Sequence, residues 1–488
     1  MRRFNLLILA AIALLLMTCS SPNDKSDQAQ KGTRPAKRSY IVYMNRSWAE
    51  PLIFERKEIA KRIMDTAALQ SRIDTRRGEK KDSVIVFCKK HELKYTESLI
   101  YVDATVAFVT DLDEKTAKEF NDQNDNLYPE VGAASFDDPF NSDDPMQQDD
   151  PMQQDDPMQQ HTDFLSERKL VPLPGGCAPP YQCTPPGTNC LTSCAVKAAG
   201  GPANEPPGPN PANRKFIWIV DTGVGPHQNL PNIMGAPWAK SFIVGATTDD
   251  DNGHGTHVAG IAAATMARFK VGGPTTGGAI TSCVKLGVSP KARIVPIKVL
   301  DKSGKGIWHD VLGALNHIVG FGRSGDVINL SLGSNDHDLC VNDPSNPVGF
   351  RSVLDILADN DNFIVIAAGN YSGDAADAFP ACLEGTTAKK GNIYTVAAME
   401  CNWDCAVYSN YGGPVDIAAV GSKVFSTYRD PTRPTLNNLF NTLSGTSMAA
   451  AVISGVIHAK GSGPDVGIRY SVCPPPPRKE YHPGRRVP

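Results

Sequence analysis

The chain has 488 residues, of which 41% are hydrophobic, so it is long enough for two or three domains with sizeable cores. Its formal net charge is -3 and no basic stripe is evident, which argues against a nucleic-acid partner. Many of its 38 prolines lie in two segments that lack apolar periodicity, and we interpret these segments as linkers.

Residues 1–19 consist of a short basic start, an apolar run from Leu6 to Met17, and a cysteine. A helix over that run would be about 18 Å long, whereas the hydrocarbon core of a bilayer is roughly 30 Å thick. The segment is therefore predicted to be an export signal peptide rather than a membrane span. Because Cys19 follows LLMT, it resembles the cysteine of a bacterial lipobox. We expect a lipid anchor in the cell envelope, with secretion to the outside as the alternative.

Export also determines how the 12 cysteines are interpreted. Cys19 and Cys88 fall in segments that we expect to be removed or processed, which leaves an even number for pairing. In an oxidising compartment these cysteines are expected to form disulfides. The cysteines within 177–194 could in principle bind zinc, but they lack paired C-x-x-C units, so disulfides are favoured over a metal site.

After a polar linker at residues 20–38, residues 39–131 alternate strand and helix signals. The order βαββαβ indicates a small split-βαβ domain, a common fold that by itself says nothing about function. The expected strands are 39–44, 83–88, 104–110 and 126–131, and the expected helices are 56–73 and 113–122.

Two low-complexity segments follow. Residues 132–164 contain four six-residue units, three of which read DDPMQQ. Paired aspartates with a proline cannot bury a core, so we expect a flexible, accessible spacer there. Residues 165–213 are rich in Cys, Pro and Gly and are interpreted as a second linker, and residues 461–488 as a Pro-rich basic tail.

Residues 214–460 have a different pattern, in which apolar, β-rich runs alternate with helical segments such as 310–320 and 351–360. Near-continuous apolar strands that alternate with helices are typical of a parallel sheet covered on both faces. We therefore expect an α/β fold with a doubly wound, mostly parallel sheet. Its strands are expected at 216–220, 293–300, 326–332, 363–368 and 393–398.

Three side chains capable of chemistry lie at the ends of these elements. Asp221 follows the apolar strand in IVDTG, and ligand sites in parallel sheets lie at such carboxyl ends. His254 lies between glycines where a helix of small residues begins. Ser447, in SGTSMAA, opens another helix, whose free N–H groups favour negative charge. Each signal alone is weak, because a DTG turn and a histidine between glycines both occur without function.

Together the three form a more specific pattern. A serine becomes nucleophilic only when a base takes its proton, and that base needs a carboxylate to orient it. Asn370 ends the buried run VIAAGN. Its side-chain amide and the Ser447 backbone N–H could both donate to an oxyanion that develops during acyl transfer.

On these motifs, residues 214–460 resemble the catalytic domain of the subtilisin-like serine endopeptidases. DTG, NGHGTHVAGI, SPKARIVPIKVL, VINLSLGS, VIAAGN, VYSNYGGPVDIAAVG and SGTSMAA match that family in order. The resemblance implies that Asp221 orients, His254 is the general base, Ser447 is the nucleophile and Asn370 completes the oxyanion hole. It also implies that His257, the second histidine of the motif, is structural.

The same resemblance suggests how substrates bind. Ser331, Leu332 and Gly333 match one strand that pairs with an extended polypeptide, and Gly304 and Gly306 belong to the other. Ala368 and Gly369 would line the pocket for the residue before the scissile bond. No charged residue is placed at the base of that pocket, so we expect an apolar preference.

Residues 39–131 resemble the inhibitory propeptide of the same family, so the chain is expected to be a zymogen with its own propeptide as an intramolecular inhibitor. The family implies no required cofactor. Calcium is an option, because Asp416 matches an aspartate that ligates calcium in some members, although it is more often structural. Asn229 stands where an aspartate often binds calcium, which weakens a second site.

The nucleophile helix departs from the family pattern at Ala451, where proline is usual, and at Val452, where histidine is usual. Alanine is the best helix former, so the first substitution is expected to leave the nucleophile in place. The alternatives to a peptidase are a catalytically inactive subtilisin-like pseudoprotease and an envelope protein that binds peptides. Neither alternative requires all four catalytic positions, and all four are present.

Overall fold

The computed structural model of the chain describes thirteen segments. These are residues 38–43, 52, 66–97, 100–103, 106–112, 129–131, 181–182, 190–203, 215–270, 280–335, 337–342, 350–383 and 390–464. The expected signal peptide, the Asp-Pro spacer and the basic tail beyond residue 464 lie outside these residues. Within them, no helix combines the length and the apolar character needed to cross a bilayer.

The centre of the molecule is a seven-stranded sheet in which every pair of neighbouring strands is parallel. Its strand order is β15-β14-β13-β12-β7-β11-β8. The strands are β7 (Phe216–Asp221), β8 (Lys240–Ser241), β11 (Arg293–Lys298), β12 (Val327–Leu330), β13 (Phe363–Ala367), β14 (Ile393–Met399) and β15 (Ile417–Val420). Five of them lie where apolar runs predicted strands, so the expected α/β fold is confirmed.

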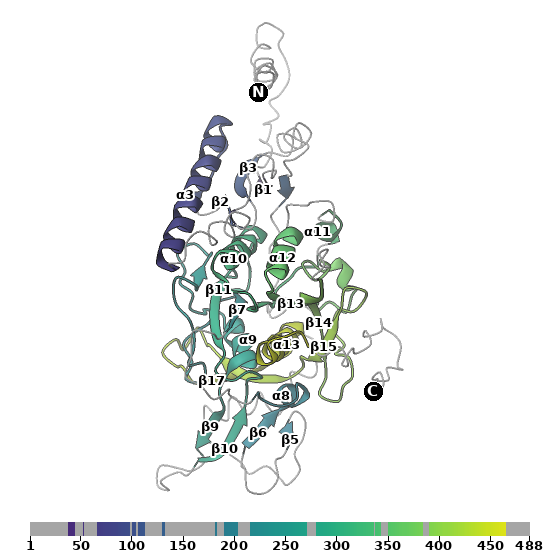
Figure 1. Ribbon diagram of the computed structural model, residues 1–488. Helices are drawn as coiled ribbons and strands as arrows, with labels where there is room; N and C mark the ends of the chain where they lie inside the picture. The colour runs from purple at the N-terminus through teal and green to yellow at the C-terminus, as the bar shows by residue number, and fades with distance from the viewer. Residues whose placement is uncertain are drawn as a thin grey trace, which may run out of the picture. The chain divides into compact units, whose positions relative to one another are not determined.

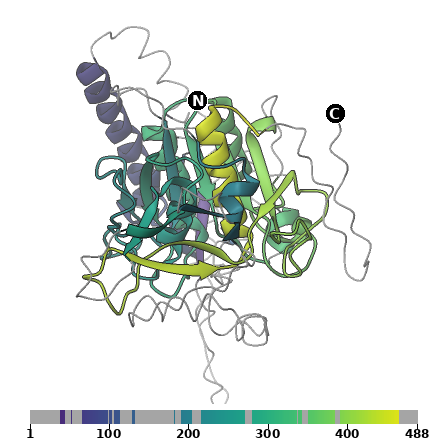
Figure 2. The same cartoon turned by 90° about the horizontal axis from the view of Figure 1, so that it is seen from below.

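Helices cover both faces of this sheet (Figure 1). α9 (His254–Ala263) and α13 (Thr446–Lys460) pack side by side on one face with a core of small aliphatic residues. α10 (Trp308–Phe321) and α12 (Phe350–Asp359) pack on the other face with a larger, more aromatic core. Figure 2, seen from below, shows α13 lying across the sheet. Burial on both faces explains why the strands are continuous apolar runs without alternation.

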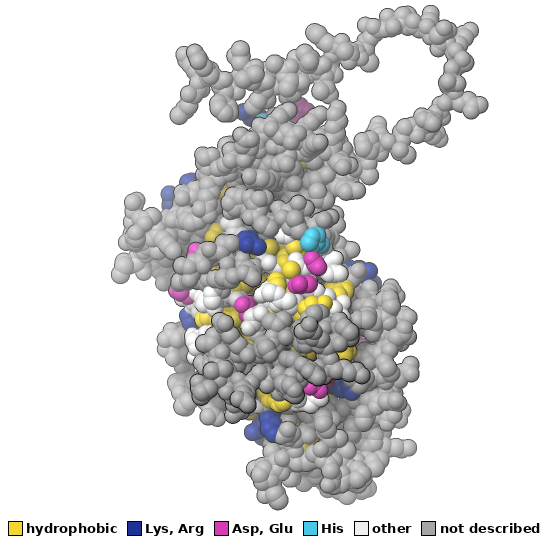
Figure 3. Space-filling view, turned by 90° about the vertical axis from the view of Figure 1, so that its right-hand side faces the viewer, with side chains coloured by type: hydrophobic (Ala, Val, Ile, Leu, Met, Phe, Trp, Pro, Cys, Tyr) yellow, Lys and Arg dark blue, Asp and Glu magenta, His cyan; other side chains and the backbone are white. Residues whose placement is uncertain are grey.

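Shorter elements complete this region. β16 (Val424–Tyr428) and β17 (Leu439–Leu443) form an antiparallel hairpin that packs on α9. This region also contains α11 (His337–Asn342) and the 3-10 turns η3 (Ala375–Asp377) and η4 (Lys390–Asn392). On the face shown in Figure 3, the Lys and Arg side chains of the described residues are scattered and form no continuous patch.

The N-terminal region contains a separate four-stranded antiparallel sheet with the order β2-β3-β1-β4. This is the strand order of a split-βαβ arrangement. The elements are β1 (Arg38–Tyr43), α3 (Thr66–Lys90), β2 (Ile100–Tyr101), β3 (Ala107–Leu112) and β4 (Pro129–Val131). The helix expected at 113–122 lies outside the described residues.

One expected strand of this region is wrong. Residues 83–88, SVIVFC, lie within helix α3, and the second strand is instead β2 at Ile100–Tyr101. Val84 and Cys88 are fully buried, whereas Val86 is 65% exposed. Residues four apart share one face of a helix, so this burial follows the helical period despite the β-branched composition.

The interpretation of residues 165–213 as a linker also needs correction. β6 (Cys190–Ser193) pairs in parallel with β10 (Ile280–Lys285), in a sheet that also contains β5 (Tyr181–Gln182) and β9 (Ala267–Lys270). Helix α8 (Cys194–Ala198) follows, and its Ala195 and Val196 belong to the core beneath α9 and α13. This part of the segment is therefore integral to the folded domain.

Disulfides link several of these elements, as the cysteine count suggested. Cys194 is bonded to Cys401, which links α8 to the loop after β14, and Cys340 is bonded to Cys382. Cys283 and Cys405 are also disulfide-bonded. Cys88, which we set apart at the outset, is a free, buried thiol in α3.

Candidate active site

The best-defined feature of the site is a buried acid–histidine pair. Asp221 is the last residue of β7, and His254 is the first residue of α9, so two separate elements bring them together. His254 Nδ1 lies 2.8 Å from Asp221 Oδ1 and 3.0 Å from Oδ2, and the two residues are 2% and 0% exposed. An ionised carboxylate can only accept, so Nδ1 carries the proton and a neutral ring has its lone pair on Nε2. This is the tautomer that a general base requires.

A second buried carboxylate, Asp250, fixes the two segments that carry this pair. Its oxygens accept hydrogen bonds from Thr222 Oγ1 at 2.9 Å and from Gly253 N at 2.8 Å. Thr222 follows Asp221, and Gly253 precedes His254 with a φ of 117°, which glycine adopts without strain. Burial raises the pKa of Asp250, and its hydrogen bonds oppose that rise. Asp250 therefore sets the geometry between the strand end and the helix start.

A buried lysine beside the pair was missed by the sequence interpretation. Lys298 ends β11 opposite Asp221, and its side chain is fully buried. Its Nζ donates to Thr222 O at 2.6 Å, Leu300 O at 2.8 Å and Asp251 Oδ1 at 2.5 Å. The sequence signal that could have found it is a single lysine within the apolar run VPIKVL. A lysine buried in such a strand needs several hydrogen-bond partners, which indicates a structured polar site around it.

The predicted nucleophile, Ser447, lies in the first turn of α13 and is 2% exposed. Its Oγ donates to Ser331 O at 3.3 Å, and Ser331 Oγ donates back to Ser447 O at 3.0 Å. Beneath them, Asn329 Nδ2 donates to Ser331 Oγ at 2.8 Å, and Asn329 Oδ1 accepts from Ser454 Oγ at 2.9 Å. This polar chain attaches the start of α13 to the end of β12.

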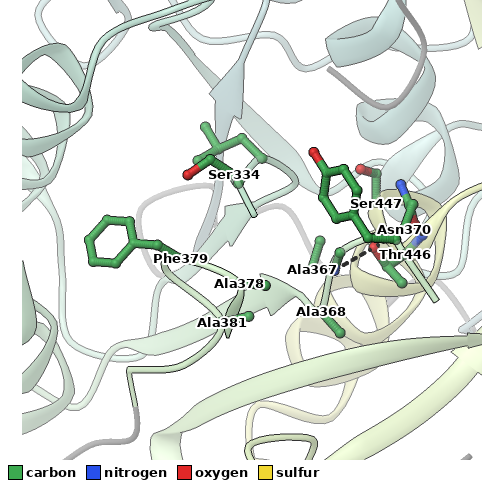
Figure 4. Close-up of a pocket in the computed structure, with 13 residues that line it drawn as sticks. Ser334, Ala367, Ala368, Asn370, Ala378, Phe379, Ala381, Thr446 and Ser447 are labelled. Atoms are coloured by element: carbon green, nitrogen blue, oxygen red, sulfur yellow. Dashed lines mark hydrogen bonds between the residues drawn. The ribbon is translucent and has the colours of Figure 1, made fainter. Parts of the chain in front are cut away.

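Asn370 lies just beyond β13, and its side chain has a defined orientation. Its Oδ1 accepts from Thr446 N at 2.9 Å and from Thr446 Oγ1 at 3.0 Å. Because the oxygen faces Thr446, the NH₂ group is the end of the amide that remains for another partner. Asn370 and Ser447 both line one pocket, so a donor and a hydroxyl face the same space (Figure 4).

That pocket has an empty volume of about 350 Å³ and contains several of the predicted substrate residues. In Figure 4, Ser447, Asn370 and Thr446 lie on one side and Ala378, Phe379 and Ala381 on the other. None of the described lining residues is charged. They are Leu332, Gly333, Ser334, Ala367, Ala368, Gly369, Asn370, Tyr371, Ala378, Phe379, Ala381, Thr446 and Ser447.

The other predicted substrate residues lie outside this lining. Ser331, the residue after β12, bonds to Ser447 as described above. Gly306 forms an isolated antiparallel bridge with Leu300, and Gly304 occupies the preceding turn with a φ of 74°. The turn is closed by Gly304 N donating to Asp301 O at 3.0 Å.

Asp416 and Asn229, the two residues considered for calcium, both make hydrogen bonds within the protein. Asp416 Oδ2 accepts from Thr395 N at 2.9 Å, and Asp416 N donates to Thr395 O at 3.0 Å, so this residue joins β14 to the start of β15. Asn229 Nδ2 donates to Met266 O at 3.0 Å. Among the described residues, no group of three or more His, Cys, Asp or Glu side chains is arranged to hold a metal. Calcium binding stays a prediction.

His257 and Ala451 are both buried in the helices that carry the site. His257 Nε2 lies 3.0 Å from Val424 O in the β16–β17 hairpin, and burial lowers the pKa of the ring to about 3. It is therefore neutral at ordinary pH and serves to join α9 to the hairpin. Ala451 and Val452 are 0% and 2% exposed, which places both substitutions in the core beneath α13.

The parallel sheet, the buried acid–histidine pair and the serine at a helix start together define a serine hydrolase of the α/β class. The family model described as "Subtilase family" matches residues 215–459. The chain belongs to the subtilase family, and it is a serine endopeptidase.

Several proteases are similar to this chain over about half of its length. Thermitase from Thermoactinomyces vulgaris is 35% identical over 242 residues, which cover 49% of this chain and 72% of thermitase. Subtilisin DY from Bacillus licheniformis is 33% identical over 241 residues, with 49% and 73% covered. The subtilisin-like serine protease AsES from Sarocladium strictum is 32% identical over 244 residues, but the match spans only 51% of that protein. A solved structure of a cold adapted subtilisin-like serine proteinase matches with a TM-score of 0.39 and 24% identity, covering 55% of this chain and 83% of that one.

Proposed function

We propose that the protein is an exported serine endopeptidase that cleaves peptide bonds through an acyl-enzyme, with Asp221, His254 and Ser447 as its triad. The observation that carries the proposal is the buried hydrogen bond of 2.8 Å from His254 Nδ1 to Asp221. It holds the imidazole in the tautomer whose Nε2 can accept a proton. The packing of α9 against α13 brings the segments of this base and of Ser447 together.

In the proposed reaction, Ser447 Oγ attacks the scissile carbonyl carbon as its proton passes to His254 Nε2. The carbonyl oxygen becomes an oxyanion, which the Asn370 NH₂ and the Ser447 N–H stabilise. Collapse breaks the C–N bond, and His254 gives its proton to the leaving amine. Water then repeats the sequence on the ester, with His254 again as base, and restores the Ser447 hydroxyl. Loss of one such oxyanion donor costs about 10²–10³ in turnover.

We further propose that the pocket accepts an apolar side chain on the residue before the scissile bond. Its wall opposite Ser447 consists of Ala378, Phe379 and Ala381, and no described lining residue could pair with a charge. An unpaired charge would lose its hydration there without compensation. Segments 331–333 and 304–306 would bind the extended backbone of the substrate on either side. Peptide anilides with Leu, Lys or Glu at this position test the preference, and Leu should be cleaved best.

A zymogen is also proposed, with residues 39–131 as the inhibitory propeptide. Contacts to the catalytic domain support it. Tyr101 OH donates to His309 O at 2.8 Å, and the Arg77 guanidinium lies 5.3 Å from the centre of the Phe321 ring. Both contacts are to α10, so the β2 end of the N-terminal sheet packs on this helix. We propose in addition that the chain is exported, that Cys19 carries a lipid, and that the propeptide is cleaved off within the spacer.

The deciding experiment is labelling of the protein with a serine-directed phosphonate, after expression that allows its maturation, alongside hydrolysis of casein. The expected result is labelling of the native chain at Ser447 and no labelling of Ser447→Ala, which should accumulate as a folded precursor. Ser462→Ala changes a serine beyond the end of α13 and is the matched control. Equal labelling, processing and casein hydrolysis in Ser447→Ala would refute the triad. Absence of labelling in the native chain would favour the inactive pseudoprotease or a peptide-binding envelope protein.

A further inference from the structure

A fully buried asparagine underlies the loop that carries Asn370. Asn410 is 0% exposed, and its side-chain amide makes three hydrogen bonds to the backbone of residues 368–373. Its Nδ2 donates to Ala368 O at 2.9 Å. Its Oδ1 accepts from Tyr371 N at 2.9 Å and from Gly373 N at 3.1 Å.

These bonds enclose Asn370 on both sides. One acceptor lies two residues before it, and the two donors lie one and three residues after it. Asn410 N adds a fourth bond, to Gly369 O at 2.9 Å. Residues 368–373 follow the end of β13, and beyond Ala368, whose N still donates to Val396 O at 3.0 Å, the strand ladder no longer satisfies their backbone groups. Thr446 Oγ1 accepts from Gly369 N at 3.1 Å, and Tyr408 O accepts from Ser372 N at 2.9 Å. Among these partners, Asn410 makes the most hydrogen bonds to the backbone on both sides of the proposed oxyanion donor.

The fit between Asn410 and the loop is close. Gly369 has a φ of +101°, and a Cβ at that position would lie 2.4 Å from Asn410 Nδ2. The backbone therefore approaches the amide more closely than any other residue would allow. Asn370 itself is held at its side-chain oxygen by Thr446, which precedes Ser447. The direction of its NH₂ group thus depends on two anchors, Thr446 for the side chain and Asn410 for the backbone.

We propose that Asn410 is a positioning residue for the reaction, which acts by holding the backbone around Asn370 so that its NH₂ meets the developing oxyanion. The proposal rests on the proposed function, because it requires Asn370 to be an oxyanion donor. Asn410 touches neither substrate nor the reacting atoms. Its effect on turnover passes through Asn370 and cannot exceed the effect of deleting that amide.

This limit gives the expected size of the effect. Misplacement of a catalytic group by about 1 Å can cost about 10²-fold in rate, and deletion of an oxyanion donor costs about 10²–10³-fold. We expect Asn410→Ala to lower kcat by between about 10-fold and 10²-fold, with a smaller change in KM. The backbone shift raises the barrier of the chemical step more than it weakens substrate binding.

The test is a double-mutant cycle on the mature enzyme with a leucyl peptide anilide, comparing the native chain, Asn410→Ala, Asn370→Ala and the double variant. The loss caused by Asn410→Ala should shrink to less than about 2-fold when Asn370 is already alanine, because coupled groups are not additive. Asn362→Ala is the matched control, since Asn362 is a buried amide that donates to Arg323 O at 2.6 Å, away from the pocket lining. It should lose stability while keeping its kcat.

Asn410→Asp keeps the shape and both acceptor bonds, and serves if the alanine variant does not fold. The new carboxyl can donate to Ala368 O only when protonated, so its kcat relative to the native chain should rise as pH falls. A ratio that does not change with pH, an unchanged kcat in Asn410→Ala, or an equal loss in both Asn370 backgrounds would overturn the proposal. The proposed function fails by a different result, an Asn370→Ala variant with native turnover.

Discussion

The replacement of Asp310 by asparagine should remove a pH-dependent cost from the folded state. Asp310 lies in the first turn of α10 and is 6% exposed, and burial raises the pKa of its carboxyl from 3.8 to about 7. His309 Nε2 lies 3.7 Å from Asp310 Oδ1, but burial lowers the pKa of that histidine to about 4. The ring is therefore neutral where Asp310 ionises. From the N-terminal sheet Tyr101 faces the same region, and its pKa is raised by burial and by Asp310.

The sign of the effect follows from the two states. Below pH 3.8 the carboxyl is protonated in both the folded and the unfolded chain, so its burial has no ionisation cost. As pH rises to about 7, only the unfolded chain loses the proton, and the folded state is progressively penalised. At about 1.4 kcal/mol per pKa unit, the full penalty above pH 7 is roughly 4 kcal/mol. Asp310→Asn should therefore stabilise the chain by up to about 4 kcal/mol at pH 8 and hardly at all at pH 4.

The assay is denaturant unfolding of Asp310→Asn in the Ser447→Ala background, which prevents self-digestion, at pH 4, 6 and 8. Asp359→Asn changes an exposed aspartate of α12 and should stay within about 0.5 kcal/mol of the parent at every pH. If residues 39–131 are removed, Tyr101 no longer covers α10, and the gain from Asp310→Asn should diminish. A difference between Asp310→Asn and its parent that is the same at pH 4 and pH 8 would refute the reasoning.

Three further predictions concern the site and its maturation. Lys298→Met removes a buried positive charge beside the acid–histidine pair, so the pKa of the His254 imidazole should rise and the acidic limb of the kcat/KM profile should move to higher pH. An unshifted limb would mean that the lysine only supports folding. Ala451→Pro places a proline ring against the carbonyl of Ser447, which accepts a hydrogen bond from Ser331 Oγ. Burst kinetics should therefore show slower acylation, and a native burst rate would contradict this. N-terminal sequencing of the mature enzyme should place its start within about residues 132–170, because proteolysis concentrates in exposed, polar segments; a start elsewhere would rule out processing in the spacer.

The sequence predicted the central sheet well because both of its faces are buried. Runs such as those of β7 and β13 are apolar without interruption, and few other structures use that pattern. The positions of Asp221, Ser447 and Asn370 at the ends of elements were also predictable, because each ends or follows a strand or opens a helix that the apolar pattern gave. The hydrogen bonds around these residues were not predictable, since Asp250, Lys298 and Asn410 bond to residues distant in sequence or to the backbone.

The two errors of the sequence interpretation have a common physical cause. In SVIVFC the β-branched composition favoured a strand, but Val84 and Cys88 find their buried contacts at a helical spacing within α3. In residues 190–198, the Cys-rich composition suggested a linker. Their structure depends on pairing with β10, which lies about ninety residues further along the chain. Local composition carries no information about such partners.

The disulfide between Cys194 and Cys401 determines what remains of this protein after its backbone is cut. The bridged cysteines are 207 residues apart in sequence, and closing a loop of that length removes roughly 5 kcal/mol of chain entropy from the unfolded state. A cut anywhere between Cys194 and Lys215 would leave two chains held as one molecule, and they would separate on a gel only under reduction. The shortest single-chain enzyme that keeps this disulfide therefore begins before Cys194, whichever bond a protease cuts upstream. The N-terminal boundary of the mature enzyme is thus limited by a disulfide as well as by the sequence of the cleavage site.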